Sequence, residues 1–156
     1  MIEARAAEVD LLQSGVWSTF VPMVGGPQLM AALAAKASAG VQLAVTGGYA
    51  VEDIAHVGGS RLFCYTPDAE LLARDLPLRR EQGMGNVVLM EPSSPAVFDR
   101  KRIAHVLAPG VPCVALSQAA IDCLSGPDRM PEAGHAALEW MEGNEAEWRQ
   151  PSPDER

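Results

Sequence analysis

The stretch that decides the fold is Val41-Gln-Leu-Ala-Val-Thr-Gly-Gly-Tyr-Ala50. Apolar side chains alternate with others over Val41–Val45, which predicts a strand. The following Thr46-Gly-Gly interrupts that strand with a tight turn. The residues after the turn, Tyr49–Val57, are expected to form a helix that Gly58-Gly59 ends.

The next stretch repeats this order of elements. The apolar run Leu62–Tyr65 predicts a short buried strand. Thr66 and Pro67 are typical of the cap and the first residue of a helix, which we expect over Asp68–Asp75. Strands that alternate with helices predict an α/β or α+β domain with a small mixed sheet covered by helices.

The N-terminal part of the chain predicts two helical segments with an extended segment between them. Ile2–Gln13 has apolar residues at helical spacing. Val16–Pro27 mixes aromatic residues with glycine and proline, and we expect an extended connector there. The alanine-rich segment Gln28–Ser38 predicts a helix, with Gly40 as its left-handed cap.

The C-terminal part predicts further strands and helices. Strands are expected over Val87–Met90 and Val111–Leu116. Ser117 is expected to cap a helix ending at Leu124, and Pro131 to begin one reaching Met141. The resulting division is 1–40 for N-terminal helices and connector, 41–143 for a regulatory α/β domain, and 144–156 for an acidic disordered tail.

Composition bounds the class of protein. With 156 residues, 48% of them hydrophobic and 21% charged, the chain has the size and composition of one globular domain. Its formal charge of −8 opposes non-specific binding to nucleic acid or anionic lipid. The three cysteines are odd in number and lie in apolar surroundings, which predicts buried, reduced thiols. No apolar run is long enough to span a membrane, so we expect a cytoplasmic protein without membrane contact.

The Gly-Gly turn is the first candidate site. A strand, two glycines and a helix present backbone N–H groups that can hold an anion or a nucleotide phosphate. The candidate residues are Thr46, Gly47, Gly48 and Tyr49. The alternative is a tight turn that needs glycine for its backbone alone.

The same turn resembles the start of the nucleotidyltransferase superfamily pattern. In that superfamily, two carboxylates on the next strand hold the catalytic metals. The corresponding strand, Arg61–Tyr65, has no carboxylate, and Asp68 and Glu70 follow it on the expected helix. We therefore expect no catalytic residues and no cofactor, and lean towards a protein that is not an enzyme.

Further motifs make the resemblance more particular. They are Val45-Thr-Gly-Gly-Tyr-Ala50, Asn86-Val-Val-Leu-Met-Glu-Pro92, Ala96-Val-Phe-Asp-Arg100, Leu116–Pro131 and the closing Ala137-Leu-Glu-Trp-Met141. Together they resemble the C-terminal domain of bacterial AbiEi-type proteins, which are antitoxins and transcriptional regulators of type IV toxin–antitoxin systems. The resemblance spans Val41–Met141 and implies a nucleotidyltransferase-like fold without transferase activity. In that family the domain follows a DNA-binding winged helix, which residues 1–40 are too short to form, so DNA binding is expected only with an additional DNA-binding segment.

Basic, metal-ligating and aromatic residues give weaker indications of a functional site. Basic residues gather in two groups, which we expect to form one patch or to pair with neighbouring acids: Arg79, Arg80, Arg100, Lys101 and Arg102. The three histidines and the cysteines lack the short spacing of zinc ligands, so no metal site is expected. Trp17, Phe20, Trp140 and Trp148 are candidate interface anchors, with Trp140 also a candidate core residue.

Three functional hypotheses follow. The preferred one is a non-catalytic regulatory domain that binds a protein partner, possibly a toxin in the sense of the family resemblance, and acts in transcriptional regulation. The second is a nucleotide-using enzyme whose phosphate site is the Gly47-Gly48 turn. The third is a self-assembling module that buries the alanine-rich face of Gln28–Ser38 against a second copy.

Overall fold

The fold is α/β, with a seven-stranded mixed sheet at its centre. It is seen in a computed structural model that describes residues 16–55, 61–81, 83, 85–103 and 110–149. The strands follow the order β4-β1-β5-β3-β2-β7-β6 across the sheet. Their bounds are β1 Val16–Pro22, β2 Ala44–Thr46, β3 Leu62–Tyr65, β4 Leu78–Arg80, β5 Val87–Glu91, β6 Arg102–Ile103 and β7 Pro112–Cys113.

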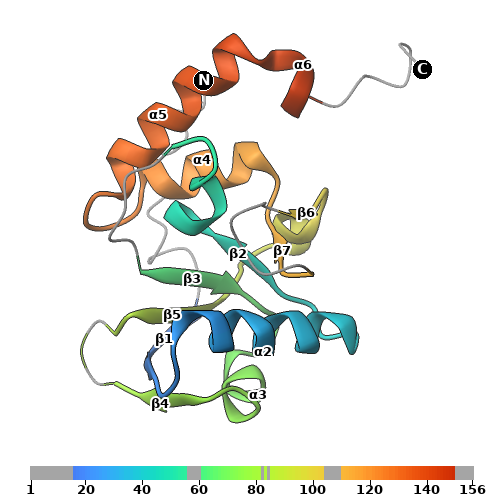
Figure 1. Cartoon of the computed structure of the whole chain (residues 1–156), viewed down its shortest axis with the longest axis vertical. Coiled ribbons are helices and arrows are strands. Elements are labelled where there is room, and N and C mark those ends of the chain that lie inside the picture. Colours follow the sequence, from blue (N-terminus) through green and yellow to red (C-terminus); the bar gives the residue numbers. More distant parts are fainter. Residues whose placement is uncertain (1–15, 56–60, 82, 84, 104–109, 150–156) are drawn as a thin grey trace.

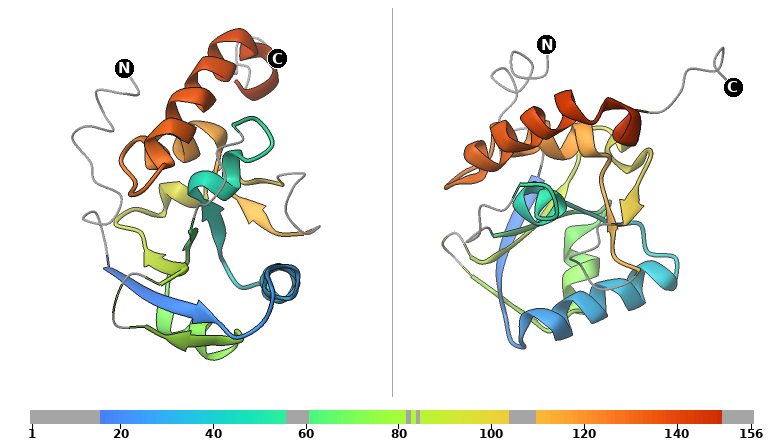
Figure 2. Two further views of the ribbon diagram at one scale, coloured as in Figure 1. Left: turned by 60° about the vertical axis from the view of Figure 1, so that its left-hand side comes forward. Right: turned by 45° about the horizontal axis from the view of Figure 1, so that its top comes forward.

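Five α-helices and two 3-10 helices connect these strands in the described residues. The α-helices are α2 Gly26–Ser38, α3 Ala69–Arg74, α4 Leu116–Leu124, α5 Met130–Gly143 and α6 Glu145–Trp148, and the 3-10 helices are η1 Gly47–Val51 and η2 Pro95–Phe98. Figure 1 shows α4 and α5 stacked on one side of the sheet and α2 and α3 on the other, and the turned views of Figure 2 agree. The expected α/β class with a helix-covered mixed sheet is confirmed.

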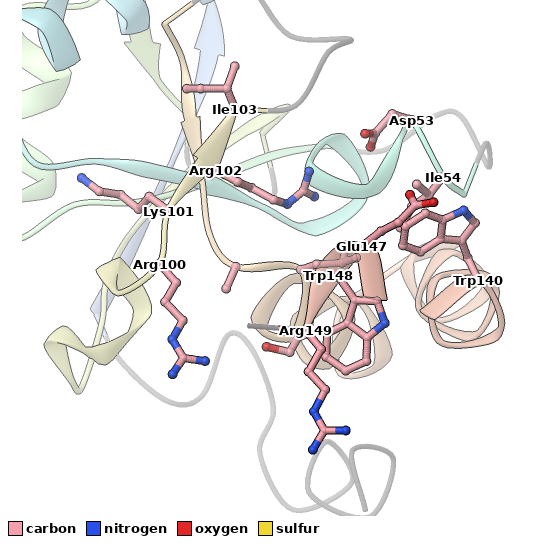
Figure 3. A pocket seen from close by; sticks show the side chains of 13 residues that line it. Asp53, Ile54, Arg100, Lys101, Arg102, Ile103, Trp140, Glu147, Trp148 and Arg149 are labelled. Atoms are coloured by element: carbon pink, nitrogen blue, oxygen red, sulfur yellow. The ribbon is translucent and has the colours of Figure 1, made fainter. Parts of the chain in front are cut away.

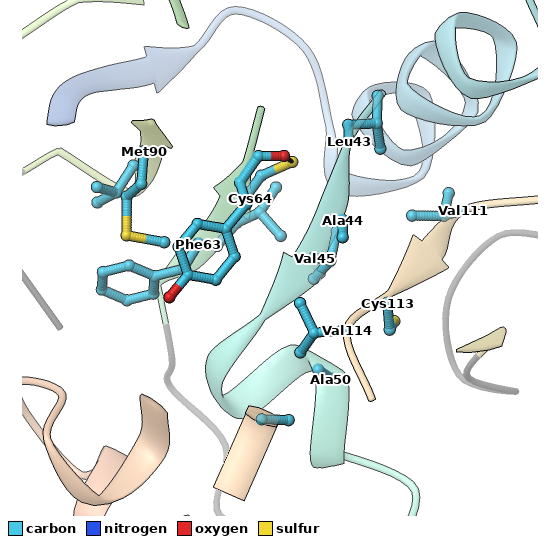
Figure 4. Packing of buried hydrophobic residues seen from close by; sticks show 14 of the residues in the cluster. Leu43, Ala44, Val45, Ala50, Phe63, Cys64, Met90, Val111, Cys113 and Val114 are labelled. Atoms are coloured by element: carbon cyan, nitrogen blue, oxygen red, sulfur yellow. Dashed lines mark hydrogen bonds between the residues drawn. The ribbon is translucent and has the colours of Figure 1, made fainter. Parts of the chain in front are cut away.

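The core lies under the central strands. β3 is antiparallel to β2 and parallel to β5, with Phe63 opposite Thr46 and Val88. Val45, Phe63 and Val88 are fully buried, and Figure 4 shows the first two packed with residues of β7 and η1. Near-continuous apolar strands of this kind are typical of a sheet covered on both faces.

The expected connector at Val16–Pro27 is wrong, because Val16–Pro22 forms strand β1. This strand lies between β4 and β5 and is antiparallel to both. Its pairing comes from residues far along the chain, which local sequence patterns do not register. The glycines and Pro27 begin α2 instead of interrupting a loop. Residue 40 is the first boundary of the expected division, and strands from both sides of it therefore belong to the same sheet.

Elements next to the glycines also differ from expectation. The segment after the Gly-Gly turn forms the short 3-10 helix η1 and turns rather than a helix over Tyr49–Val57, whose last two residues lie outside the described part. The strand expected over Val111–Leu116 is limited to Pro112–Cys113 as β7, and α4 begins at Leu116. Ala115 caps that helix, so the expected capping by Ser117 is wrong.

The other expected elements agree with the structure within a few residues. α2 ends before Gly40, whose φ of 95° suits its role after the helix. α3 is capped by Asp68, whose carboxylate accepts a hydrogen bond from Leu71 N. The expectation of disorder from residue 144 is wrong for the start of that segment, because Glu145–Trp148 forms α6, in which the Trp148 indole donates to Met141 O at 2.7 Å. The helix expected at Ile2–Gln13 and the tail residues 150–156 lie outside the described residues.

Candidate functional site

The Gly-Gly turn is joined to a buried carboxylate, in what we name the Asp122 cluster: Thr46, Tyr65, Gln118 and Asp122. Asp122 Oδ2 accepts hydrogen bonds from Thr46 Oγ1 at 2.6 Å and from Tyr65 OH at 3.0 Å. Asp122 Oδ1 accepts from Gln118 Nε2 at 3.0 Å. The cluster ties α4 to β2 and β3, and Asp122 is only 4% exposed.

Burial changes the acidity of this cluster. It raises the pKa of Asp122 from 3.8 to about 6, and the three hydrogen bonds oppose part of that rise because they stabilise the carboxylate. Burial, together with the neighbouring Asp122 charge, raises the pKa of Tyr65. Tyr65 therefore remains a neutral hydrogen-bond donor to Asp122.

Side chains of α5 and β3 pack closely against the first glycine of the turn. Gly47 has a φ of 76°, and a Cβ placed on it would lie 2.9 Å from Met130 Cε and 3.4 Å from the Phe63 ring. Gly48 is also buried, and Tyr49 is half-buried against the core. The four candidate anion-binding residues thus lie together beneath α4 and α5. The proposal of a ligand there stays a prediction, and this packing accounts for the glycine at position 47 without a ligand.

The acids beside β3 have structural partners. Asp68 caps α3, and Glu70 forms an ion pair with Arg80. β3 itself is a strand without a carboxylate, as the sequence indicates. In the described residues, no group of three or more histidine, cysteine, aspartate or glutamate side chains is placed to hold a metal ion.

The basic residues do not form one patch. Arg79 and Arg80 lie on β4, at one edge of the sheet, whereas Arg102 lies on β6 at the opposite edge with Arg100 and Lys101 just before it. Arg80 pairs with Glu70 and lies over the Phe20 ring, 5.5 Å from its centroid. The two groups therefore belong to separate surfaces.

The second of these groups lines a pocket of about 850 Å³, which we name the α6 pocket. The pocket lies between β6, the end of η1, the start of α4 and the end of α5 with α6. Its lining residues are Asp53, Ile54, Arg100, Lys101, Arg102, Ile103, Ala115, Leu116, Ser117, Trp140, Glu147, Trp148 and Arg149, most of which Figure 3 labels. Cationic and aromatic side chains from distant parts of the sequence thus meet in one place.

The cations of the α6 pocket differ in their partners. Arg102 donates to Ala50 O across to η1, while its Nε is buried without a partner among the described residues. Arg149 pairs with Glu145 one turn away, on the exposed side of α6. In the described part of the chain no ion pair or side-chain hydrogen bond is found for Arg100 or Lys101. Arg102 therefore has a structural contact and Arg149 an exposed ion pair, whereas Arg100 and Lys101 have no such partner among the described residues.

Sequence reasoning missed Asp122 and the assembly of the α6 pocket. Asp122 lies on the same helical face as the buried Ala119 and Cys123, and an acid on an apolar face signals a buried, hydrogen-bonded carboxylate. No comparable signal joins Arg100 to Trp148, because only tertiary packing brings them together. The candidate interface anchors also separate: Phe20 is buried, Trp17 is 40% exposed, and Trp140 and Trp148 line the pocket.

The three cysteines are buried, as expected. Burial raises the pKa of Cys64 and of Cys123 to about 12, which keeps both thiols protonated and unreactive.

Comparison with known proteins finds no matching family, no matching curated protein and no matching solved structure. Among the described residues, no helix has the length and apolar character that a membrane crossing requires.

Proposed function

We propose that this chain is a non-catalytic regulatory domain that acts by binding another macromolecule, and that the α6 pocket is its binding site. The observation that carries the proposal is the meeting of four cations with two half-buried tryptophans in that pocket. Arginine and tryptophan are enriched among the residues that contribute most to binding at interfaces. Here they line a concave surface, where burial of a partner side chain or base strengthens each contact.

The buried Gly-Gly turn supports a structural role for the motif that would otherwise favour an enzyme. The carboxylate hydrogen-bonded to that turn, Asp122, receives three hydrogen bonds and is almost fully covered. A group that catalyses or holds a ligand must reach that ligand. The α6 pocket is therefore the stronger candidate for function.

The motif resemblance carries the finer part of this proposal. It supports a nucleotidyltransferase-like arrangement and an antitoxin-like role in transcriptional regulation, in the cytoplasm and with a protein partner such as a toxin. Self-association through α2 is a weaker candidate, because Leu29, Met30 and Leu33 already face the core. DNA binding would require a further segment that supplies a DNA-binding fold.

Site-specific photo-cross-linking tests this proposal. A benzophenone amino acid is placed at Ile103, which lines the pocket and is 52% exposed, in the full tagged chain expressed in its source cells. Leu71 on α3 is the matched control, because it is 55% exposed and Figure 1 places α3 at the far end of the molecule. We expect one discrete macromolecular adduct from Ile103 and none from Leu71.

Pocket variants complete the test. The adduct is expected to disappear when Arg100→Gln and Arg149→Gln are combined, and to persist in Arg79→Gln, which lies on the opposite sheet edge. Adducts from both positions, or from Leu71 alone, would overturn the assignment of the binding site.

A further inference from the structure

The α6 pocket combines the two chemistries that a nucleotide presents. Positive groups suit phosphate, and flat aromatic rings suit a base, which stacks on them regardless of its identity. We infer that this pocket binds a nucleoside phosphate, either as a free nucleotide or as the end of a single strand. The inference rests on the proposed role of the α6 pocket and names what that pocket recognises.

The local charge favours an anion in an otherwise acidic protein. Among the described residues, the pocket lining contains four cations and two acids, Asp53 and Glu147, whereas the whole chain has a formal charge of −8. The pocket therefore attracts a phosphate, although the net charge of the chain opposes it. Such focusing by a cleft raises the local concentration of its ligand.

The position of Arg100 suits a phosphate contact. Its φ of 57° lies in the left-handed region, which is uncommon for a residue other than glycine. The residue links η2, anchored by the buried Phe98, to β6. In the view of Figure 3, its side chain extends in the same direction as that of Arg149, whereas Lys101 extends elsewhere. A guanidinium group can donate two hydrogen bonds to phosphate oxygens.

The Arg149 guanidinium is free to exchange partners. Its ion pair with Glu145 is exposed on both sides, 68% for the arginine and 57% for the glutamate side chain. Exposed pairs of this kind contribute between about 0 and 1 kcal/mol, because water solvates both charges. A phosphate, with more charge and more acceptor oxygens than one carboxylate, competes well for the guanidinium.

Trp148 supplies the stacking surface. Its indole nitrogen donates to Met141 O, so that the ring is held in place while it is only half-buried. Trp140 lines the same pocket from α5 beside Ile54 (Figure 3). A ring fixed before binding loses little freedom when a base stacks on it, which favours binding.

The size of the pocket and the net charge of the chain limit the ligand. A volume of about 850 Å³ lies within the range of small-molecule sites. A long strand would extend past the pocket, where the net charge of −8 opposes the binding of further phosphates. The recognised unit is therefore one nucleotide, or very few.

Calorimetric titration of the full chain tests the inference with defined probes: adenosine 5′-monophosphate, adenosine, inorganic phosphate and a six-nucleotide adenosine strand with or without a 5′-phosphate. We expect saturable binding of the monophosphate, about tenfold tighter than that of adenosine or phosphate alone, because each of these lacks one of the two contacts. Arg100→Gln and Arg149→Gln are each expected to weaken binding of the monophosphate about fivefold or more. Arg79→Gln, on the opposite sheet edge, is expected to leave it unchanged.

The strand separates the two sources. Tighter binding of the 5′-phosphorylated strand than of the monophosphate would identify a strand end, and weaker binding would identify a free nucleotide. No saturation by the monophosphate, equal affinity for phosphate alone, or an equal loss in Arg79→Gln would overturn the inference. A protein adduct from Ile103 without nucleotide binding would support the proposed function and refute the nucleotide as ligand. Nucleotide binding without any adduct would support the nucleotide as ligand and refute the proposed binding of a macromolecule.

Discussion

The Gly-Gly turn and the α6 pocket differ in how their polar groups are satisfied. In the turn region, the Asp122 carboxylate and its three donors satisfy one another beneath α4 and α5. In the pocket, Arg100 and Lys101 have no such partner among the described residues. A glycine motif can therefore record a packing requirement, while the surface available to a ligand is formed by residues that no local motif connects.

The largest effect should come from removing the buried carboxylate. Asp122→Leu leaves the Thr46 hydroxyl and the Tyr65 hydroxyl without their acceptor in a buried site, and each lost acceptor costs about 1–3 kcal/mol. We expect the free energy of unfolding to fall by about 4 kcal/mol, measured by urea denaturation. Asp99→Leu, at an exposed position, is the control and should change it by less than about 0.5 kcal/mol. Similar losses for both variants would contradict a structural role of the Asp122 cluster.

The second effect is a dependence of stability on pH. The pKa of Asp122 is raised to about 6 in the folded chain, so the folded state retains a proton that the unfolded state releases between about pH 4 and pH 6. The Asp122 contribution to stability is therefore present below pH 4, decreases as pH rises through this window, and stays lower above it.

Asp122→Asn isolates this contribution, because the amide does not ionise in this range and retains hydrogen-bonding capacity towards Thr46 and Gln118. Measured by urea denaturation at pH 4 and pH 7.5, the wild-type chain should lose up to about 3 kcal/mol more stability than the variant. An equal loss in both proteins would mean that the Asp122 pKa does not change on folding.

The third prediction tests whether the Gly-Gly turn is packing or ligand site. Gly47→Ala places a methyl group at a φ of 76° and 2.9 Å from Met130 Cε, and both features oppose the substitution. We expect a loss of about 2 kcal/mol in the free energy of unfolding. Gly143→Ala, at the end of α5 with open space around it, should be neutral or slightly stabilising.

Nucleotide binding by Gly47→Ala tests whether the turn or the α6 pocket holds the phosphate. If Gly47→Ala is folded and still binds adenosine 5′-monophosphate with unchanged affinity, the turn is structural. If a folded Gly47→Ala loses nucleotide binding while Arg100→Gln retains it, the phosphate site is the Gly-Gly turn and not the α6 pocket.

The sequence predicts the central strands well because their signal is local. Leu62–Tyr65 is an uninterrupted apolar run, and its strand has the expected bounds. β1 was missed because its pairing with β5 depends on a partner about 70 positions later in the chain. Helix α4 begins two residues before the expected position because tertiary packing buries Leu116. The capping preference of serine, on which the expected start depends, does not take that packing into account.

The candidate site is harder to predict than the fold. Gly47 and Gly48 form a recognisable motif, and their backbone requirement is as well explained by packing as by an anion. Arg100 and Trp148 are separated in the chain by strands β6 and β7, helices α4 and α5 and most of α6, and their meeting depends on how α5 and α6 lie over the sheet edge. Spacing in a single sequence does not indicate that arrangement, so it groups Arg100 with Arg79, which lies at the opposite edge of the sheet.

The smallest effect should come from the acidic residues of the α6 pocket. Glu147 lines the pocket, so its charge opposes an incoming phosphate. Glu147→Gln preserves the shape of the side chain and removes that repulsion. We expect adenosine 5′-monophosphate to bind about two- to threefold tighter, since a solvated charge at this distance contributes only a few tenths of a kcal/mol. Glu142→Gln, exposed on α5 and outside the pocket lining, is the control, because it changes the net charge equally and should leave affinity unaltered. Equal gains in both variants would show that net charge alone attracts the nucleotide, and the contrast between a focused pocket and the rest of the surface would then fail.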